Sequence, residues 1–265
     1  FAGTKDLYWG GTTALGTISL ALIPNELAAD KVLQCRQSVI ASADEYLQIM
    51  NSQGYQVPLE PTGYVWGSNS DVLNRMMIMG LAYDFTQDQT YLHGMVESMD
   101  YLLGRNPLNK SYVSGYGEND LIHPHHRFWG NQPGQGFPPP PPGVIAGGPN
   151  GSPADPAAEA AGLTGNPPAK SYVDDYESYS TNEVAINWNA PLAWAAAYLD
   201  DSARPVLSGV PPVPTVTPPA ASATSVPDTA TQTVPVPRAE VAALLGVLVF
   251  GVLVVAGLAW RRRRS

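Results

Sequence analysis

Three of the chain's four histidines lie together in the segment HPHHRFWGN, residues 123–131, beside an arginine and a tryptophan. Imidazole and guanidinium groups together offer several hydrogen-bond donors, which suits a ligand rich in hydroxyl groups. A metal site and a packed loop are the alternatives. Metal binding would favour two histidines one helical turn apart or a supporting Cys or Asp nearby, and the proline excludes a helix here. We therefore predict a hydroxyl-binding segment that holds no metal.

A second segment, YVDDYESYSTNEVAINWNA at 172–190, mixes carboxylates with aromatic rings. Sugar rings stack on aromatic faces, and a carboxylic acid of raised pKa can protonate a glycosidic oxygen, so this mixture is typical of sugar chemistry. A solvated acidic helix start would have a similar pattern. The tryptophan of GYVWGSNSD, Trp66, is equally compatible with a sugar platform and with ordinary packing. The carboxylates are Asp174, Asp175, Glu177 and Glu183, and the rings are Tyr172, Tyr176, Tyr179 and Trp188.

Composition narrows the possible classes of protein. The 265 residues are 44% apolar, which favours a globular protein with a core. The four arginines at 261–264 carry +4 of the formal charge of −9, so the remainder carries −13 and nucleic acid is excluded as a partner. The single cysteine, Cys35, cannot form an internal disulfide, and its helical spacing from Val32 and Val39 predicts a buried thiol.

Helical periodicity dominates residues 1–203. No convincing alternating strands appear there, so the predicted fold class is all-α. One apolar stripe runs through residues 30–50. A second helix covers 68–88, with Ser70 as its expected N-cap, and a third runs from about Gln89 to a C-terminal glycine, Gly104. A fourth is expected to begin near Pro191. The inward stripe of the third helix is predicted to be Leu92, Met95, Val96, Met99, Leu102 and Leu103.

The longest expected loop runs from about Phe128 to Lys170 and contains five consecutive prolines at 138–142, which exclude helix and sheet. A loop of this length inside a compact domain is usually functional.

The C-terminal part changes in composition twice. Residues 204–238 are rich in Pro, Thr and Ser and nearly free of charge, which predicts a disordered linker. Residues 239–260 then predict one transmembrane helix, followed by a basic tail at 261–265. Because positive charge favours the cytoplasmic side, residues 1–203 are expected outside, anchored at the cell surface. A removable sorting signal is the alternative, but no LPxTG-type motif precedes the apolar run, which favours a retained anchor.

Both segments resemble signatures of glycoside hydrolase family 9, the cellulases with an (α/α)6 barrel. SYVSGYGENDLIHPHHR at 111–127 resembles the histidine signature, and 172–190 resembles the second signature. YVWGSNSDVLNR, DYLLGRNPLNKSYV and NAPLAWAAAYLDD are similar as well, so the likeness spans about residues 5–202. The resemblance implies that this region, taken as residues 1–203, supplies the later helices of the barrel.

The resemblance also implies roles for individual residues. Glu183 would be the general acid and Asp174 a second active-site carboxylate that supports it. His125 would bind substrate next to the cleavage point, Arg127 would contact glucosyl hydroxyls, and Tyr179 would be a subsite aromatic. The reaction would be inverting hydrolysis of β-1,4-glucosidic bonds in cellulose or a related β-glucan, with no cofactor. Members often bind calcium, but no ligands for it are assigned here.

One catalytic group has no counterpart in the sequence. The family's base lies in an Asp-Ala-Gly-Asp type motif, and nothing like it occurs among the 265 residues. The chain opens on Phe1 without a signal peptide, so we expect a fragment that is inactive by itself and exposes unusual apolar surface. The alternatives are a non-catalytic carbohydrate-binding surface protein and a structural spacer, of which the spacer leaves the clustered acids and rings unexplained.

Overall fold

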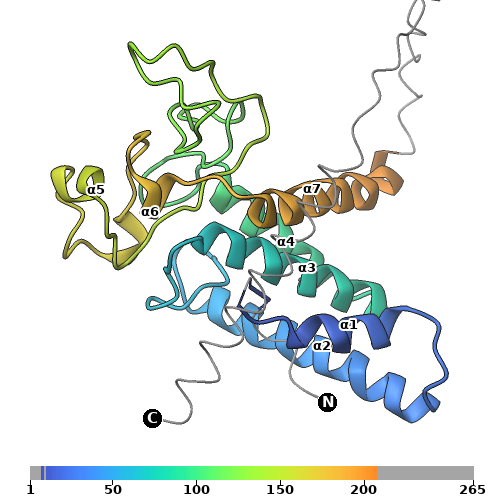
Figure 1. Cartoon of the computed structure of the whole chain (residues 1–265). Helices are drawn as coiled ribbons and strands as arrows, with labels where there is room; N and C mark the ends of the chain where they lie inside the picture. The colour runs from blue at the N-terminus through green and yellow to red at the C-terminus, as the bar shows by residue number, and fades with distance from the viewer. Residues whose placement is uncertain (1–6, 9, 208–265) are drawn as a thin grey trace, which may run out of the picture. The chain divides into compact units, whose positions relative to one another are not determined.

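The computed structural model describes residues 7, 8 and 10–207, and these form a helical body with long connecting loops (Figure 1). Among these residues β-structure is limited to isolated bridges, so the all-α prediction is confirmed for the described part. The long helices are α1 (Thr13–Leu22), α2 (Ala29–Asn51), α3 (Ser68–Thr86), α4 (Gln89–Leu102) and α7 (Ile186–Leu207). The short ones are α5 (Pro156–Ala160), α6 (Tyr179–Asn182) and a 3₁₀ turn (Pro168–Lys170).

Helix α3 is the central element and packs against α2, α4 and α7, while α1 covers α2 (Figure 1). The predicted methionine-rich stripes supply much of this core, since Met76, Met79 and Met95 are fully buried. Cys35 is buried as predicted. Burying these apolar faces between helices is the main force that holds the body together.

Contact between α3 and α7 depends on a glycine. A Cβ at Gly80 would lie 3.0 Å from the Trp194 ring and 3.1 Å from the Met95 sulfur, so the glycine lets this ring of α7 pack closely on α3. The Tyr198 hydroxyl also donates to Asp84 Oδ1 at 2.6 Å, and the Gly80 carbonyl lies 2.9 Å from the same hydroxyl oxygen.

Two helix starts differ from the predicted ones. Helix α3 begins after Gly67, whose φ is +86°, and Ser70 lies inside its first turn instead of capping it. The cause is tertiary, because the Asn69 N–H donates to the Gly147 carbonyl at 2.9 Å and so needs no side-chain cap. Helix α7 begins at Ile186, five residues before Pro191. Pro191 lacks an N–H, so it cannot donate to the Asn187 carbonyl one turn earlier. Because Asn187 is exposed, water can donate to that carbonyl instead, and the helix continues through the proline.

The third predicted helix ends where expected, since α4 stops at Leu102 and Gly104 follows with φ +135°. Its inward stripe is only partly correct. Leu92, Met95, Met99 and Leu102 contribute to the core, whereas Val96 and Leu103 are 44% and 36% exposed. Both side chains are therefore partly open to solvent, and Leu15, Leu22 and Leu33 on α1 and α2 are exposed as well.

Helix α7 continues to Leu207, past the expected start of the linker at 204. The remainder of that linker, the predicted transmembrane helix at 239–260 and the basic tail at 261–265 lie outside the described residues. Within residues 7, 8 and 10–207, no helix combines the length and apolar character that a membrane span requires.

Candidate active site

The loops between α4 and α7 bring the two predicted segments together. His125 donates its N–H to the Asn182 carbonyl at 2.8 Å and forms an isolated parallel bridge with Glu183. On the other side of the same strand-like segment, the Gly147 N–H donates to the Glu183 carbonyl at 2.8 Å. The backbone of Glu183 is therefore held between the histidine segment and a loop from the proline-rich region.

The side chain of Glu183 is paired with Trp66. The indole Nε1 donates to Glu183 Oε2 at 3.0 Å, although the two residues are 117 positions apart. Trp66 is 46% exposed, and its ring lies 5.7 Å from that of Tyr179. The sequence left open whether Trp66 is a sugar platform or an ordinary packed residue. An accessible ring beside the predicted acid favours the sugar platform.

The predicted substrate-binding rings continue away from Trp66. Tyr179 meets His125 edge-on with a centroid distance of 5.9 Å, and His125 lies 5.7 Å from Tyr176. His125 Nδ1 contacts the Tyr176 carbonyl at 2.5 Å, and because a carbonyl only accepts, this nitrogen carries the proton. Nε2 is then left as the nitrogen that can face a ligand.

Asp174 is held by the loop that carries the histidines. Its two oxygens accept from the Ile122 N–H at 2.9 Å and the His123 N–H at 2.8 Å. Lys110 Nζ also donates to it at 2.7 Å, in an ion pair whose side chains are 10% and 14% exposed. With both oxygens engaged, Asp174 positions the histidine segment, and this geometry suits the supporting role predicted for it better than direct attack on substrate.

Sequence reasoning missed Lys110 and Asn182, which complete this junction. Besides Asp174, Lys110 Nζ binds the Asp120 carbonyl at 2.5 Å. Asn182, fully buried next to Glu183, donates to the His123 carbonyl at 2.6 Å and accepts from the Tyr172 hydroxyl at 2.6 Å. A single lysine or asparagine in a loop gives no local signal of such a role, because all its partners are distant in sequence.

Asp155 was also missed, and it fixes the segment that leads into the acid. Its carboxylate caps α5 through Ala158 N–H at 2.7 Å and accepts from Ser180 N–H at 2.8 Å and from the hydroxyls of Ser178 and Ser180. Burial alone would raise the pKa of Asp155, but these hydrogen bonds outweigh it and lower the pKa from its ordinary value. The aspartate before Pro156 signals a helix start in the sequence, but not the contacts with Ser178 and Ser180.

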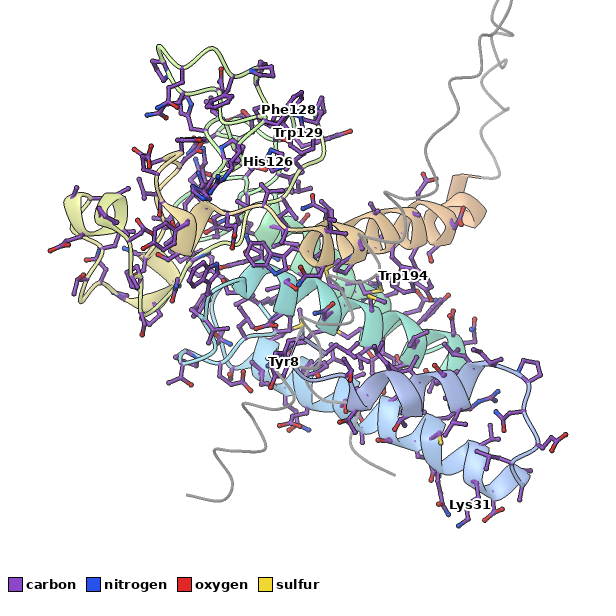
Figure 2. The ribbon with its side chains drawn as sticks, viewed as in Figure 1. Tyr8, Lys31, His126, Phe128, Trp129 and Trp194 are labelled. Carbon is purple, nitrogen blue, oxygen red and sulfur yellow. The ribbon has the colours of Figure 1, made fainter. Side chains whose placement is uncertain are left out.

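The histidine segment also contains Arg127, His126, Phe128 and Trp129. Arg127 is exposed and makes no hydrogen bond or ion pair with the other described site residues. His126 stacks on Trp129 at 4.3 Å, next to the exposed Phe128 (Figure 2). Burial and the neighbouring His125 lower the pKa of His126, so it is neutral near pH 7.

No metal centre accompanies the site in the part of the chain that the structure describes. None of its His, Cys, Asp and Glu side chains form a group of three or more that could hold an ion. Within that part, His125 instead contacts Tyr176 and Asp174 contacts Lys110 and backbone amides.

A hollow of about 450 Å³ opens beside Trp66. Its wall includes Tyr8, Asp71, Asn187 and Trp188, so it mixes rings with groups that can bind hydroxyls. Glycines make room for Trp188, because a Cβ at Gly67 or at Gly147 would lie 2.9 Å from its ring. The hollow is connected to Glu183 through Trp66, which lines it and donates to the Glu183 carboxylate.

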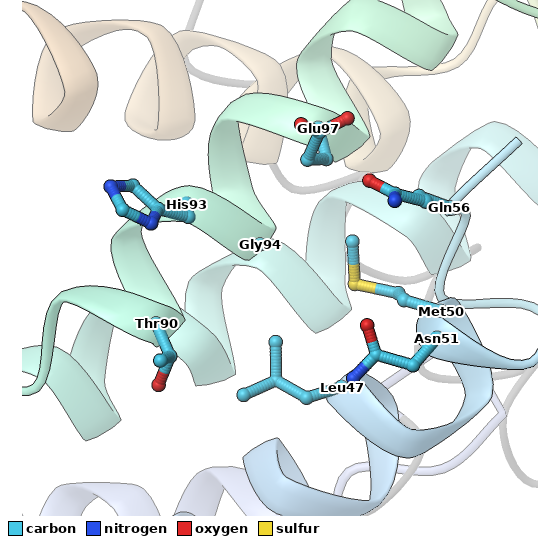
Figure 3. A pocket seen from close by; sticks show the side chains of 8 residues that line it. All are labelled: Leu47, Met50, Asn51, Gln56, Thr90, His93, Gly94 and Glu97. Atoms are coloured by element: carbon cyan, nitrogen blue, oxygen red, sulfur yellow. The ribbon is translucent and has the colours of Figure 1, made fainter.

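Another hollow, of about 350 Å³, lies between α2 and α4 (Figure 3). His93 and Glu97 project from α4 on one side, and Leu47 and Met50 from α2 on the other. It contains none of the predicted site residues, so it is separate from the site around Glu183.

Comparison with known proteins agrees with this geometry. The family described as glycosyl hydrolase family 9 matches residues 2–196.

The chain belongs to this family.

Among curated relatives, this family 9 chain is 52% identical over 198 residues to a cellulose 1,4-beta-cellobiosidase from Acetivibrio thermocellus, covering 73% of the chain and 22% of that protein. It is 43% identical over 215 residues to endoglucanase C from Cellulomonas fimi, and the match covers 79% of this chain and 19% of that protein. The chain thus spans about a fifth of the length of these relatives.

Solved family 9 structures share the fold of the described body. A metagenome-derived endoglucanase superposes with a TM-score of 0.64 at 31% identity, covering 72% of this chain and 33% of that one. The predicted family is confirmed, and the helical body is consistent with part of the family's (α/α)6 barrel.

Proposed function

We propose that this chain is the acid-bearing part of an inverting hydrolase that cleaves β-1,4-glucosidic bonds in cellulose or a related β-glucan. Glu183 is the general acid that protonates the leaving oxygen. The observation that carries the proposal is its placement, with Oε2 3.0 Å from Trp66 Nε1 and the Tyr179 and His125 rings alongside. A sugar ring stacked on these aromatics would present its glycosidic oxygen to the carboxyl group.

Relatives named as a cellobiosidase and as an endoglucanase both support a β-1,4-glucan substrate. Their names divide between attack at chain ends and internal attack, so the proposal extends to the bond and not to the pattern of cleavage. Inversion needs a base on the opposite ring face, at roughly 6.5–9.5 Å from the acid. The Asp-Ala-Gly-Asp type motif that would supply it is absent from these 265 residues.

A non-catalytic carbohydrate-binding surface protein is the second candidate, because the described site carboxylates do not supply the base that inversion needs. Asp174, the other predicted active-site carboxylate, is 14% exposed and has both oxygens engaged, so it is not free to activate water. If no other carboxylate completes the site, the rings and His125 would still bind a glucan without cleaving it.

The test uses the full-length natural protein that contains this chain, assayed on swollen cellulose. Glu183→Gln keeps the size of the side chain but removes its proton, so hydrolysis should fall by about 10²–10⁴-fold while glucan binding is retained. Glu177→Gln is the matched control, since Glu177 is exposed in the same segment. Proton NMR of the first product should show the inverted anomer.

Unchanged turnover in Glu183→Gln would remove the residue from this role. Glucan binding by the unaltered protein without release of reducing sugar would instead establish the binding-protein candidate.

We also propose that the apolar segment 239–260 and the arginines at 261–264 anchor the protein at the cell surface, with the linker giving the catalytic part reach. Deleting residues 239–265 should move the protein from the membrane fraction to the medium. Equal release of the intact and shortened proteins would contradict anchoring.

A further inference from the structure

Phe137 continues the row of site rings. It stacks on Tyr176 with a centroid distance of 5.7 Å and an interplanar angle of 25°, and Tyr176 in turn neighbours His125. The row therefore runs Trp66, Tyr179, His125, Tyr176, Phe137, with neighbouring centroids 5.7–5.9 Å apart. It begins at the side chain bonded to Glu183 and ends in the proline-rich loop.

The Tyr176 ring packs closely against a glycine. A Cβ at Gly130 would lie only 2.2 Å from the Tyr176 ring, so the ring rests directly on glycine backbone inside the histidine segment. The Tyr176 carbonyl also holds His125. Tyr176 thus links the predicted substrate-binding histidine to Phe137 through fixed contacts.

The five prolines that follow Phe137 are anchored at their far end. Ser114 Oγ donates to the Pro141 carbonyl at 2.6 Å, and the Gly143 N–H donates to the Ser114 carbonyl at 2.8 Å. Pro142 packs against Gly115, where a Cβ would approach it to 2.8 Å. Residues 137–143 therefore form a strut with Phe137 at one end and Ser114 at the other.

Proline suits such a strut. Its ring fixes φ, so the run needs no hydrogen-bond ladder to stay extended and loses little conformational entropy when it is held in place. A flexible loop would have to be ordered each time a ligand bound. The strut instead holds Phe137 in position before any ligand arrives.

We propose that Phe137, supported by Tyr176 and the proline strut, is the platform of a further glucosyl-binding position beyond His125. This inference rests on the proposed function and deepens it, because it assigns an additional sugar unit of the same β-1,4-glucan chain to a ring outside the family signatures. The Phe137 ring is partly exposed, so it can offer apolar surface to a pyranose ring.

The experiment measures the affinity of the full-length natural protein for cello-oligosaccharides of three to six units by calorimetry, in a Glu183→Gln background so that they are not consumed. Phe137→Ala should weaken binding of the longest oligosaccharide by about 2- to 10-fold, the range for one aromatic contact, and leave the shortest unchanged. Phe137→Leu keeps the apolar packing without the ring and should show the same length-dependent loss. Phe128→Ala is the control, because that ring is 65% exposed and lies outside the row.

A length-independent loss, or wild-type affinity in Phe137→Leu, would assign Phe137 to loop packing alone and overturn the inference while leaving the proposed function intact. If the protein with Phe137 present binds no oligosaccharide of any length, the proposed function fails and this inference fails with it.

Discussion

The helical body and the loop region between α4 and α7 are stabilised in different ways. In the body, apolar side chains on α2, α3 and α4 interlock, and Leu73, Met76 and Met79 are fully buried. In the loop region, buried polar side chains hold the backbone instead, as Asp155, Asn182 and Lys110 do around Glu183. Hydrophobic packing is non-directional, whereas a hydrogen bond requires a defined distance and angle. A functional site needs its side chains held in such a defined geometry.

The two regions should therefore respond differently to substitution. Changes in the body should lower stability and leave the site of each folded molecule intact. Changes in the loop region should alter the site as well as stability.

The largest effect on stability is expected in the body. Leu73→Ala should reduce the free energy of unfolding by about 2–5 kcal/mol, because the side chain is fully buried and leaves a cavity. Thermal unfolding measures the loss, and glucan affinity per folded molecule should not change. The control, Leu33→Ala, removes an exposed leucine and should shift stability by less than about 0.5 kcal/mol. If fully folded Leu73→Ala bound glucan more weakly than the natural protein, changes in the body would also alter the site, and the distinction between the two regions would be wrong.

Lys110→Met tests the loop region. It leaves Asp174 with two backbone donors, a longer contact from the Asn182 amide and no cation, which should cost about 3 kcal/mol, the lower end for breaking a buried pair. Because Asp174 holds residues 122 and 123, glucan affinity should fall together with stability. Lys31→Met is the control, since Lys31 pairs with Asp30 at the surface. A stability loss without any change in affinity would show that the junction is structural only.

Asp155→Asn should produce the smallest effect and a distinctive pH dependence. The folded-state pKa of Asp155 lies below its ordinary value, so the carboxylate stabilises the fold above about pH 4, and this stabilisation is lost as pH falls through the lowered pKa. The amide variant should lose about 1–3 kcal/mol at neutral pH and show a flatter stability profile in acid. Unfolding curves between pH 2 and 7 measure the loss at neutral pH and the slope in acid. Parallel stability profiles for the variant and the natural protein would contradict the role of the Asp155 carboxylate.

Much of the body was predictable from the chain alone. Apolar spacing located α2, α3 and α4, and Gly104 marked the end of α4. The same spacing placed Val96 and Leu103 inward, although both are exposed, and the preference of proline for a first helical turn placed the start of α7 at Pro191 instead of Ile186. Local pattern identifies an apolar face, but it cannot say which part of that face a neighbour will cover.

The sequence by itself determined the family, through two long signatures whose residue types the chemistry requires, and it singled out Glu183, Asp174, His125, Arg127, Tyr179 and Trp66. Only the tertiary structure decided that Trp66 binds Glu183, that Lys110 neutralises Asp174 and that Phe137 joins the ring row. Periodicity and motifs are short-range properties of a chain. Contacts between residues separated by 117 and 64 positions depend on how the helices pack and the loops close, and no local pattern encodes that.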